Sequence, residues 1–505
     1  MAIEQKTLHW TQEDLLKSLL YFVGHFLLLL FIVAALLLGD KLSELKMIMS
    51  KNAASYSYVL LCIILLVCIL YFYFYYEGKH ILASGKHITL IFCILDIYVI
   101  IAYLLGNYFG IYTRPVAFIG LMTFMLVGRK EAIFLNVIGS LVMFIIDTFG
   151  VEATTAMESC SSLIISFSAG MIAIFFCEKA KTRFRIIGIG LLIVIPIDFV
   201  IFLLGLSSLI GPEADAIVGL SPWQVIFTNM GKGLFGGIMS TVFFLTLLPV
   251  FEGLFNCLTV FRIRELTSSD AKILKRLKVE ASGTYTHVTV VSQLAEACAA
   301  AIGENMDYAR AAALYHDVGK LHHPEYFTEN QHGYNVHDEL LPELSADLIR
   351  SHASEGYALI RKSHLPEFLA DVALQHHGTL PIRYFYAKAL KLSDGELNME
   401  DFSYRGPKPQ SKIAAIIMIA DAAEAAVRAS GNRSPENVEK CVRKIIDERM
   451  ELEQFAECDI TMVDLTRIRW ALVNELSGVY HHRIKYPSIK YKKTAEGKMK
   501  GENSK

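Results

Sequence analysis

Long apolar stretches alternate with short polar ones through residues 1–261 of this 505-residue chain. Most of the apolar stretches reach the roughly 20 residues that an α-helix needs to cross the hydrocarbon core of a bilayer. The fourth is short, which leaves a tilted or re-entrant helix, or close pairing with the fifth, as alternatives to a full span. The pattern predicts a membrane domain over 1–261 with about eight spans, near 18–39, 57–76, 87–107, 114–128, 132–149, 161–178, 185–207 and 233–256.

The pattern changes to mixed charge and helical periodicity after residue 261. Residues 262–282 include ILKRLKVEA, which suits an amphipathic junction helix. Residues 283–487 contain Ala-rich segments such as SKIAAIIMIADAAEAAVRA, in which apolar positions recur at helical spacing. Short breaks that contain Gly or Pro separate these segments, as in a compact all-α bundle. Residues 488–505 are rich in lysine and show no packed pattern, so we expect a disordered tail there.

The distribution of charge separates the same two parts. Residues 1–261 contain 15 Lys or Arg and 16 Asp or Glu, whereas residues 262–505 contain 33 and 34. The formal net charge of −2 provides no basic field, so we do not expect the chain to bind nucleic acid. The nine cysteines are scattered and form no CxxC pair, which argues against a disulfide framework and against a Cys-based zinc site.

Basic loop residues predict the orientation of the membrane domain, because cytoplasmic loops carry an excess of Lys and Arg. Loop 179–185 carries four basic residues and segment 262–278 carries six, so we expect both, and the second domain, in the cytoplasm. Eight spans then place the N-terminus inside as well. Loop 40–56, with three lysines, violates the rule, and it is too short for a large extracellular domain.

Three aspartates fall within predicted spans, namely Asp96, Asp147 and Asp198. Charged groups inside a membrane are costly and often functional. Interhelical polar pairing and a small ligand pocket would each explain them, and both interpretations stay open.

Histidine is concentrated in the second domain, with 4 of the 16 residues before position 262 and 12 after it. Long sequence separations mean that these side chains come from different helices, and a bundle core can bring them together, as in helical di-metal proteins. Asp421 lies in the apolar run IIMIADAAEA, where an unpaired carboxylate would carry a large desolvation cost that a cation removes. A structural role for each residue taken singly is the alternative. The candidate ligands are His287, His316, Asp317, His352, His376, His377 and Asp421.

Ligand chemistry narrows the metal and the reaction. Histidine and carboxylate ligands without thiolate suit two divalent ions, Fe or Mn, with Zn as a further option. In the adjacent pair His316-Asp317, the imidazole can bind one ion while the carboxylate bridges to the second. Two such ions activate a bridging water for displacement at phosphorus. Lys320 lies one turn beyond His316 and could stabilise charge on phosphate, or could simply be a surface lysine. Asp317 and Lys320 are therefore the candidate catalytic residues.

The patterns YHDVGK, QHHGT and IADAAEA resemble those of HD-domain phosphohydrolases. Over about 251–487 the chain is similar to the membrane-bound seven-transmembrane-receptor-type HD hydrolases, whose characterised members are cyclic di-AMP phosphodiesterases. The resemblance implies an HD domain over 283–487 that holds two metal ions on the candidate ligands. It also implies a signalling enzyme of the cell membrane, in which metal-activated hydroxide opens cyclic di-AMP to linear pApA. The family usually places a large extracellular domain after the first span, where this chain has only residues 40–56.

Other functions remain as alternatives. A cyclic di-GMP phosphodiesterase of the HD-GYP kind would carry an acidic stretch with Gly-Tyr-Pro after its His pair, whereas HHGTLPIRYFYAKAL follows here. A membrane receptor that binds a cyclic dinucleotide with little turnover, and more remotely a transporter, represent different classes. The expected partners are a cyclic dinucleotide substrate and the lipid bilayer. The sequence leaves open whether the chain forms a homodimer, and whether both His376 and His377 bind metal.

Overall fold

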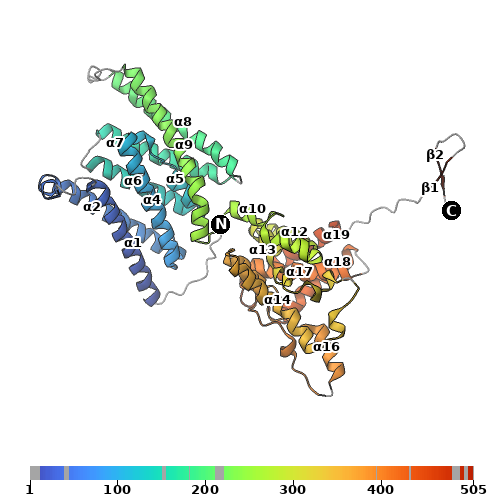
Figure 1. The fold of residues 1–505 in the computed structure, drawn as a ribbon. Coiled ribbons are helices and arrows are strands. Elements are labelled where there is room, and N and C mark those ends of the chain that lie inside the picture. Colours follow the sequence, from blue (N-terminus) through green and yellow to red (C-terminus); the bar gives the residue numbers. More distant parts are fainter. Residues whose placement is uncertain are drawn as a thin grey trace. The chain divides into compact units, whose positions relative to one another are not determined.

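The computed structural model describes residues 12–38, 45–149, 155–180, 182–210, 221–331, 333–393, 395–430, 434–479, 489–493 and 499–503. The chain divides into two compact units, Met1–Glu265 and Leu266–Lys505, so the boundary lies four residues beyond the predicted one. Both units are built from helices (Figure 1), which confirms the predicted all-α class.

The first unit is a bundle of long apolar helices. Among the described residues, seven helices are long and apolar enough to cross a membrane, which makes the chain a multi-pass membrane protein. These seven are α1 (Gln12–Leu38), α2 (Leu45–Tyr76), α4 (Gly85–Phe109), α6 (Arg129–Phe149), α7 (Ala156–Cys177), α8 (Arg183–Ile210) and α9 (Pro222–Leu254). Shorter elements are α3 (Lys79–Leu82), the 3₁₀ helix η2 (Ile111–Thr113), α5 (Phe118–Leu126) and α10 (Val260–Leu266).

The fourth predicted span, 114–128, is not a long helix. It consists of an extended turn after η2 followed by the nine-residue helix α5. Gly110, at φ 101°, ends α4, and Pro115 interrupts the chain before α5 begins. Almost every residue of α5 is buried, and α5 packs against α4, α6, α7 and α9. Irregular backbone is tolerated at membrane depth where protein surrounds it, which is the situation here.

A buried ion pair fixes the turn that precedes α5. The Arg114 guanidinium donates to both carboxylate oxygens of Asp147 on α6, with an Nη2–Oδ1 distance of 2.7 Å. Both side chains are only 4% exposed. Arg114 also donates from Nε to the carbonyl of Ala102 at 3.2 Å and from Nη1 to the Ser162 hydroxyl at 3.3 Å. Of the three aspartates within predicted spans, Asp147 is thus explained by polar pairing inside the bundle.

The second unit has a core of small residues. α12 packs against α13, α17 and α19, and α14 packs against α15, α16 and η3. Alanines are fully buried along α13 and α17, which lets neighbouring helices approach closely. The helices are α11 (Lys272–Glu280), α12 (Ser282–Ile302), α13 (Met306–Tyr315), α14 (Pro342–Lys362), α15 (Glu367–Gln375), α16 (Arg383–Leu392), α17 (Lys412–Ala429), α18 (Pro435–Glu451) and α19 (Met462–Val479). The 3₁₀ helices are η3 (Val318–Leu321), η4 (Pro324–Tyr326), η5 (Thr328–Asn330), η6 (Val336–Asp338) and η7 (Met399–Phe402).

Two predicted segments differ from the structure. The junction 262–282 is not one helix, because α10 and α11 are separated by residues 267–271. The tail 488–505 is not wholly disordered, since β1 (Ile489–Lys493) and β2 (Met499–Asn503) pair antiparallel, with Tyr491 opposite Gly501. Alternating residues such as those of IKYKK can form a strand once a partner is available, whereas composition alone signals only a lack of core.

Candidate metal centre

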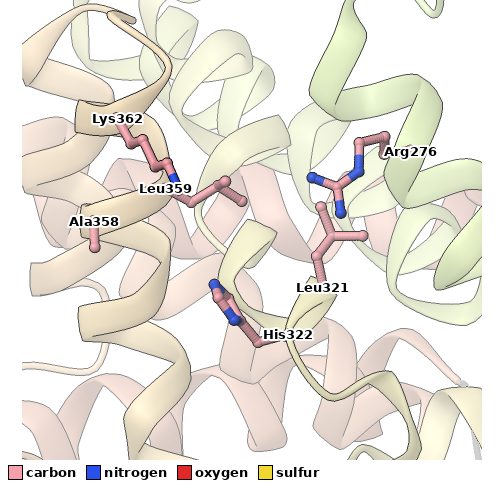
Figure 2. Close-up of a pocket in the computed structure, with 6 residues that line it drawn as sticks. All are labelled: Arg276, Leu321, His322, Ala358, Leu359 and Lys362. Atoms are coloured by element: carbon pink, nitrogen blue, oxygen red, sulfur yellow. The ribbon is translucent and has the colours of Figure 1, made fainter.

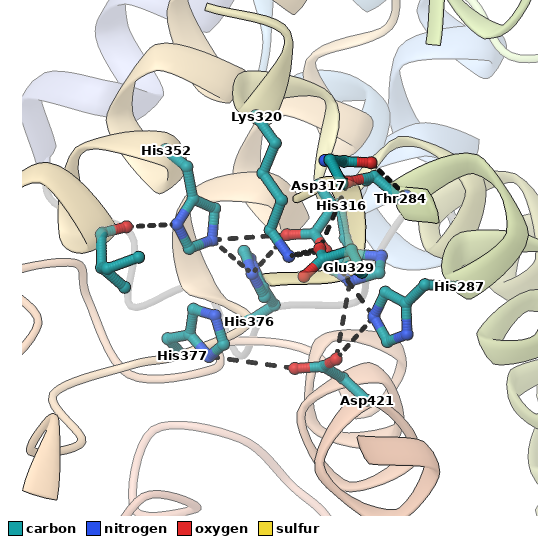
Figure 3. Close-up of polar contacts among 12 residues, drawn as sticks. Thr284, His287, His316, Asp317, Lys320, Glu329, His352, His376, His377 and Asp421 are labelled. Carbon is teal, nitrogen blue, oxygen red and sulfur yellow. Dashed lines mark hydrogen bonds and ion pairs between the residues drawn. The ribbon is translucent and has the colours of Figure 1, made fainter. Parts of the chain in front are cut away.

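All the predicted ligands of the second unit come together in its core (Figure 3). His287 lies on α12, His352 on α14 and Asp421 on α17. His316 caps the end of α13, and His376 caps the end of α15. Asp317 and His377 follow these two histidines directly in sequence, and Lys320 lies on η3. The predicted convergence of separate helices is therefore what the structure has.

Two groups of side chains could each hold a metal ion, and Asp317 lies between them. The groups are His352, His376 and His377, and His287, His316 and Asp317. Asp317 Oδ1 lies 3.4 Å from His352 Nε2 and 3.7 Å from His376 Nε2. Its other oxygen, Oδ2, lies 3.3 Å from His316 Nε2 and 3.6 Å from His287 Nε2. One carboxylate thus faces histidines of both groups, as a bridging ligand would.

The backbone orients three of the histidines in the same way. Nδ1 of His316, His352 and His376 lies within hydrogen-bond distance of the carbonyl oxygen three residues earlier, at Ala313, Ile349 and Ala373. A carbonyl can only accept, so each Nδ1 carries the proton and each Nε2 presents a lone pair. These Nε2 atoms are the ones that face Asp317. The tautomer is thus set for ligation before any ion binds.

The donor set fits a divalent cation. His352 Nε2 lies 3.3 Å from His376 Nε2, and two lone pairs at that distance repel unless a cation lies beside them. His316 Nε2 and Asp317 Oδ1 are buried and have no hydrogen-bond partner within the described part of the chain. Burial, together with neighbouring His352, lowers the pKa of His377 to about 3, so this ring is neutral near pH 7. Neutral imidazoles and a carboxylate are the protonation states that metal binding requires.

The other end of the site is held by two carboxylates around His287. Nε2 of His287 lies 2.9 Å from Asp421 Oδ1, and Nδ1 lies 2.8 Å from Glu424 Oε2. Burial lowers the pKa of His287, but hydrogen bonds to Asp421 and Glu424 outweigh it and raise the pKa to about 10. A metal ion bound through His287 Nε2 must therefore displace a proton. Asp421 also reaches toward the other group, with Oδ2 4.0 Å from His377 Nδ1.

Glu424 was not among the predicted site residues. It is 2% exposed and lies three residues after Asp421, on the same face of α17. Its contact with His287 Nδ1 is the carboxylate–histidine arrangement that orients a ligating imidazole and raises its basicity. The spacing in IADAAEA could have signalled a shared face, but nothing in the sequence pairs Glu424 with a residue 137 positions away.

We expect Glu424→Ala to weaken metal binding by about 10–100-fold, because His287 loses the group that orients it. The measurement is metal retention by the purified chain against a chelator of graded concentration. Arg428→Ala is the control on the same helix, since Arg428 is 44% exposed and its Nη2 lies 3.7 Å from Glu424 Oε2, beyond hydrogen-bond distance. Equal loss in both variants would show that the helix, and not the His287 contact, is responsible.

Lys320 lies next to Asp317 and is only 12% exposed. Its Nζ lies 2.8 Å from Asp317 Oδ2 and 2.9 Å from Glu329 Oε1. Burial acts to lower the pKa of Lys320, but the two carboxylates outweigh it and raise the pKa above its usual value. The Thr284 hydroxyl, 3.2 Å from Glu329 Oε1, supports this network. Lys320 is thus not a surface lysine, and it keeps a positive charge beside the ligands.

Two backbone segments meet directly next to the site. A Cβ on Gly319 would overlap the carbonyl oxygen of His352 and would lie 2.6 Å from the nitrogen of Gly356. Glycine is therefore required at this position of HDVGK for a steric reason. Nearby, the ring of Tyr404 stacks on His377 with centroids 4.3 Å apart. Tyr404 is a second neighbour of the ligands that the sequence did not single out.

A separate cavity opens elsewhere on the second unit (Figure 2). It has a volume of about 410 Å³ and contains no candidate ligand. His322, which is not one of the candidate ligands, is among its lining residues. The others are Arg276, Leu321, Ala358, Leu359 and Lys362.

Both units of the chain match known protein families. Residues 53–259 match the family model described as "7TM receptor with intracellular HD hydrolase", and residues 284–426 match the HD domain. The chain is 36% identical over 413 residues to the cyclic-di-AMP phosphodiesterase PgpH of Bacillus subtilis (strain 168), covering 82% of this chain and 56% of that protein. It is also 36% identical over 379 residues to PgpH of Listeria monocytogenes serotype 1/2a (strain 10403S), covering 74% and 50%.

A solved structure of the L. monocytogenes PgpH HD domain in complex with cyclic-di-AMP is 45% identical, with a TM-score of 0.41. The match covers 42% of this chain and 99% of that one. The chain spans about half the length of the two full-length PgpH relatives. The family matches fall on both units, and the HD match spans all the candidate histidine and aspartate ligands from His287 to Asp421. The chain therefore belongs to the family of seven-transmembrane receptors with an HD hydrolase domain.

Proposed function

We propose that the chain is a membrane-anchored, metal-dependent phosphodiesterase that hydrolyses cyclic di-AMP to pApA. The observation that carries the proposal is the position of Asp317 between two groups of histidines, with one carboxylate oxygen toward each. A carboxylate in this position can bridge two divalent metal ions, and two-metal sites of this kind catalyse displacement at phosphorus. The substrate rests on the relatives, which are named for their action on cyclic di-AMP.

Each ligand group has a part in this reaction. His352, His376 and His377 would hold one ion, and His287 and His316 the other, with Asp317 and Asp421 between them. Imidazole and carboxylate ligands favour Fe or Mn, with Zn as a further option. When bound, the ions supply a water of lowered pKa and neutralise charge on the phosphate. Burial lowers the pKa of His352, His376 and His377, which keeps these three imidazoles neutral. The fold also excludes bulk water, since His316 and His376 are fully buried.

Lys320 acts in two ways in this proposal. Its contacts with Asp317 Oδ2 and Glu329 Oε1 hold the bridging carboxylate in place. Its positive charge also favours a phosphodiester next to Asp317, because fixed cations at the point where negative charge develops lower the barrier. The aromatic ring of Phe327, 4.8 Å from Nζ, limits the movement of this side chain.

The proposal also assigns the HD domain to the intracellular side. Basic residues stand at the start of α6, as Arg129 and Lys130, and at the α7–α8 turn. Lys86 lies at the start of α4, and it is on the same side of the membrane as Arg129 only if residues 110–128 cross the bundle between the end of α4 and the start of α6. These residues contain η2 and α5. Counting them as one crossing also gives seven elements within 53–259, as the family description requires.

The test is to incubate the purified full chain, loaded with Mn or Fe, with cyclic di-AMP and separately with cyclic di-GMP. We expect pApA from the first substrate and much slower turnover of the second. Tight binding of cyclic di-AMP without pApA under any metal would favour a receptor and overturn the enzyme proposal. Faster turnover of cyclic di-GMP would overturn the assigned substrate but keep the reaction class.

A further inference from the structure

A groove of about 430 Å³ lies at the turn between α7 and α8, far in sequence from the HD domain. We call it the α7–α8 groove. One end is cationic and the other is apolar. Its lining residues are Phe176, Lys179, Ala180, Phe184, Arg185, Gly188, Ile189 and Leu192.

Along α8 the lining changes from a charged residue to apolar ones, which matches the head group and hydrocarbon chain of an amphiphile. Arg185, Gly188 and Leu192 follow at helical spacing and form one stripe that begins at the turn and runs into the membrane-spanning part. At 1.5 Å per residue, the stripe is about 10 Å long. Phe176 and Phe184 flank it and are 51% and 81% exposed, as side chains that face lipid are. A charged group at the turn and a hydrocarbon chain along the stripe would both find matching surface.

The charge at the turn is available for a ligand. The neighbouring carboxylates are paired elsewhere, Glu178 with Arg129 at 3.1 Å and Glu265 with Arg183 at 2.6 Å. Within the described residues, no carboxylate forms an ion pair with Lys179 or Arg185. Arg185 Nη1 donates to the carbonyl of Lys179 at 2.8 Å, which keeps the two cations adjacent.

The apolar end is open. A Cβ on Gly188 would meet no atom within 4 Å, so this position leaves space on the helix surface. We propose that the α7–α8 groove binds a phospholipid with an anionic head group, whose phosphate contacts Lys179 and Arg185 and whose acyl chain lies over Gly188, Ile189 and Leu192. Basic pockets between transmembrane helices are suited to such head groups.

The test uses native mass spectrometry of the full chain in detergent, with phosphatidylglycerol and phosphatidylcholine added in equal amounts. We expect the wild type to retain phosphatidylglycerol preferentially. The double variant Lys179→Ala/Arg185→Ala should bind phosphatidylglycerol about 25-fold more weakly, since each basic residue near an anionic lipid contributes about 5-fold. Its binding of phosphatidylcholine should not change. The charge-matched control is Lys86→Ala/Lys130→Ala, because both lysines are exposed and line no part of the groove.

A second variant tests the apolar end. Gly188→Leu adds a side chain to the stripe where a Cβ meets no atom, and it should reduce retention of both lipids. Gly231→Leu, at a helical glycine where a Cβ likewise meets no atom, should leave retention unchanged. Glycerol phosphate, which has the head group but no chain, should not displace the bound lipid. Equal retention of both lipids by the wild type, or an unchanged preference in the double variant, would overturn the proposal. Displacement by glycerol phosphate would also overturn it, because the site would then bind only an anion.

Discussion

Asp317→Ala is expected to lower the rate of cyclic di-AMP hydrolysis by about 1,000-fold or more. The substitution removes the one carboxylate whose two oxygens face His352 and His376 on one side and His316 and His287 on the other. It also leaves Lys320, whose side chain is only 12% exposed, with Glu329 as its remaining counter-charge. The metal content of the purified variant, measured by elemental analysis, should fall together with the rate.

The chain provides a matched control for this substitution. His337-Asp338 is a second His-Asp pair, but Asp338 is exposed and His337 Nε2 contacts the backbone carbonyl of Tyr326 at 2.9 Å. Asp338→Ala should therefore change neither rate nor metal content appreciably. A full loss of activity in Asp338→Ala, or a fully active Asp317→Ala, would contradict the assignment of the site.

Arg114→Ala is expected to destabilise the membrane unit by about 3–5 kcal/mol, because it leaves the Asp147 carboxylate buried without its guanidinium. The two side chains are each 4% exposed, so water cannot replace the lost partner. The measurement is the denaturant midpoint of the full chain in detergent, followed by helix content. The turn before α5 should loosen first, since Arg114 also holds the carbonyl of Ala102.

Two further variants separate burial from charge in that experiment. Arg129→Ala removes a pair in the same unit whose members, Arg129 and Glu178, are about half exposed, and it should cost less than about 1 kcal/mol. Arg114→Ala/Asp147→Ala removes both charges and should cost less than Arg114→Ala alone. If Arg129→Ala lowered the free energy of unfolding as much as Arg114→Ala does, burial of the Arg114–Asp147 pair would not explain the effect.

The sequence predicted the helices well because their signal is local. Apolar stretches and 3.6-residue periodicity depend only on neighbouring residues, so α4 and α17 could be placed from their own segments. The region around α5 could not, because hydropathy averages over Pro115 and Gly110 and does not reveal that the short helix is enclosed by others. The strands β1 and β2 were missed for a related reason, since composition does not reveal a pairing partner.

Some residues of the candidate site could likewise be predicted from the sequence, and others could not. Histidine and aspartate in apolar helices are conspicuous by type, so residues such as His352 and Asp421 could be singled out before any geometry was known. Glu424 and Tyr404 are ordinary residues whose importance lies in contacts across the fold, with His287 and His377. Arg114 belongs with them, because its partner Asp147 is 33 positions away on another helix.

The contact of Gly319 with α14 has a mechanical consequence. Side chains at an interface can change rotamer and absorb a small displacement, whereas two backbones in van der Waals contact cannot. α14 carries His352, and Gly319 stands two residues after Asp317. A shift of α14 would therefore change the distance between the His352 imidazole and the Asp317 carboxylate, because no side chain at the contact can absorb the shift. The distance between the two candidate ligand groups therefore depends directly on the position of α14.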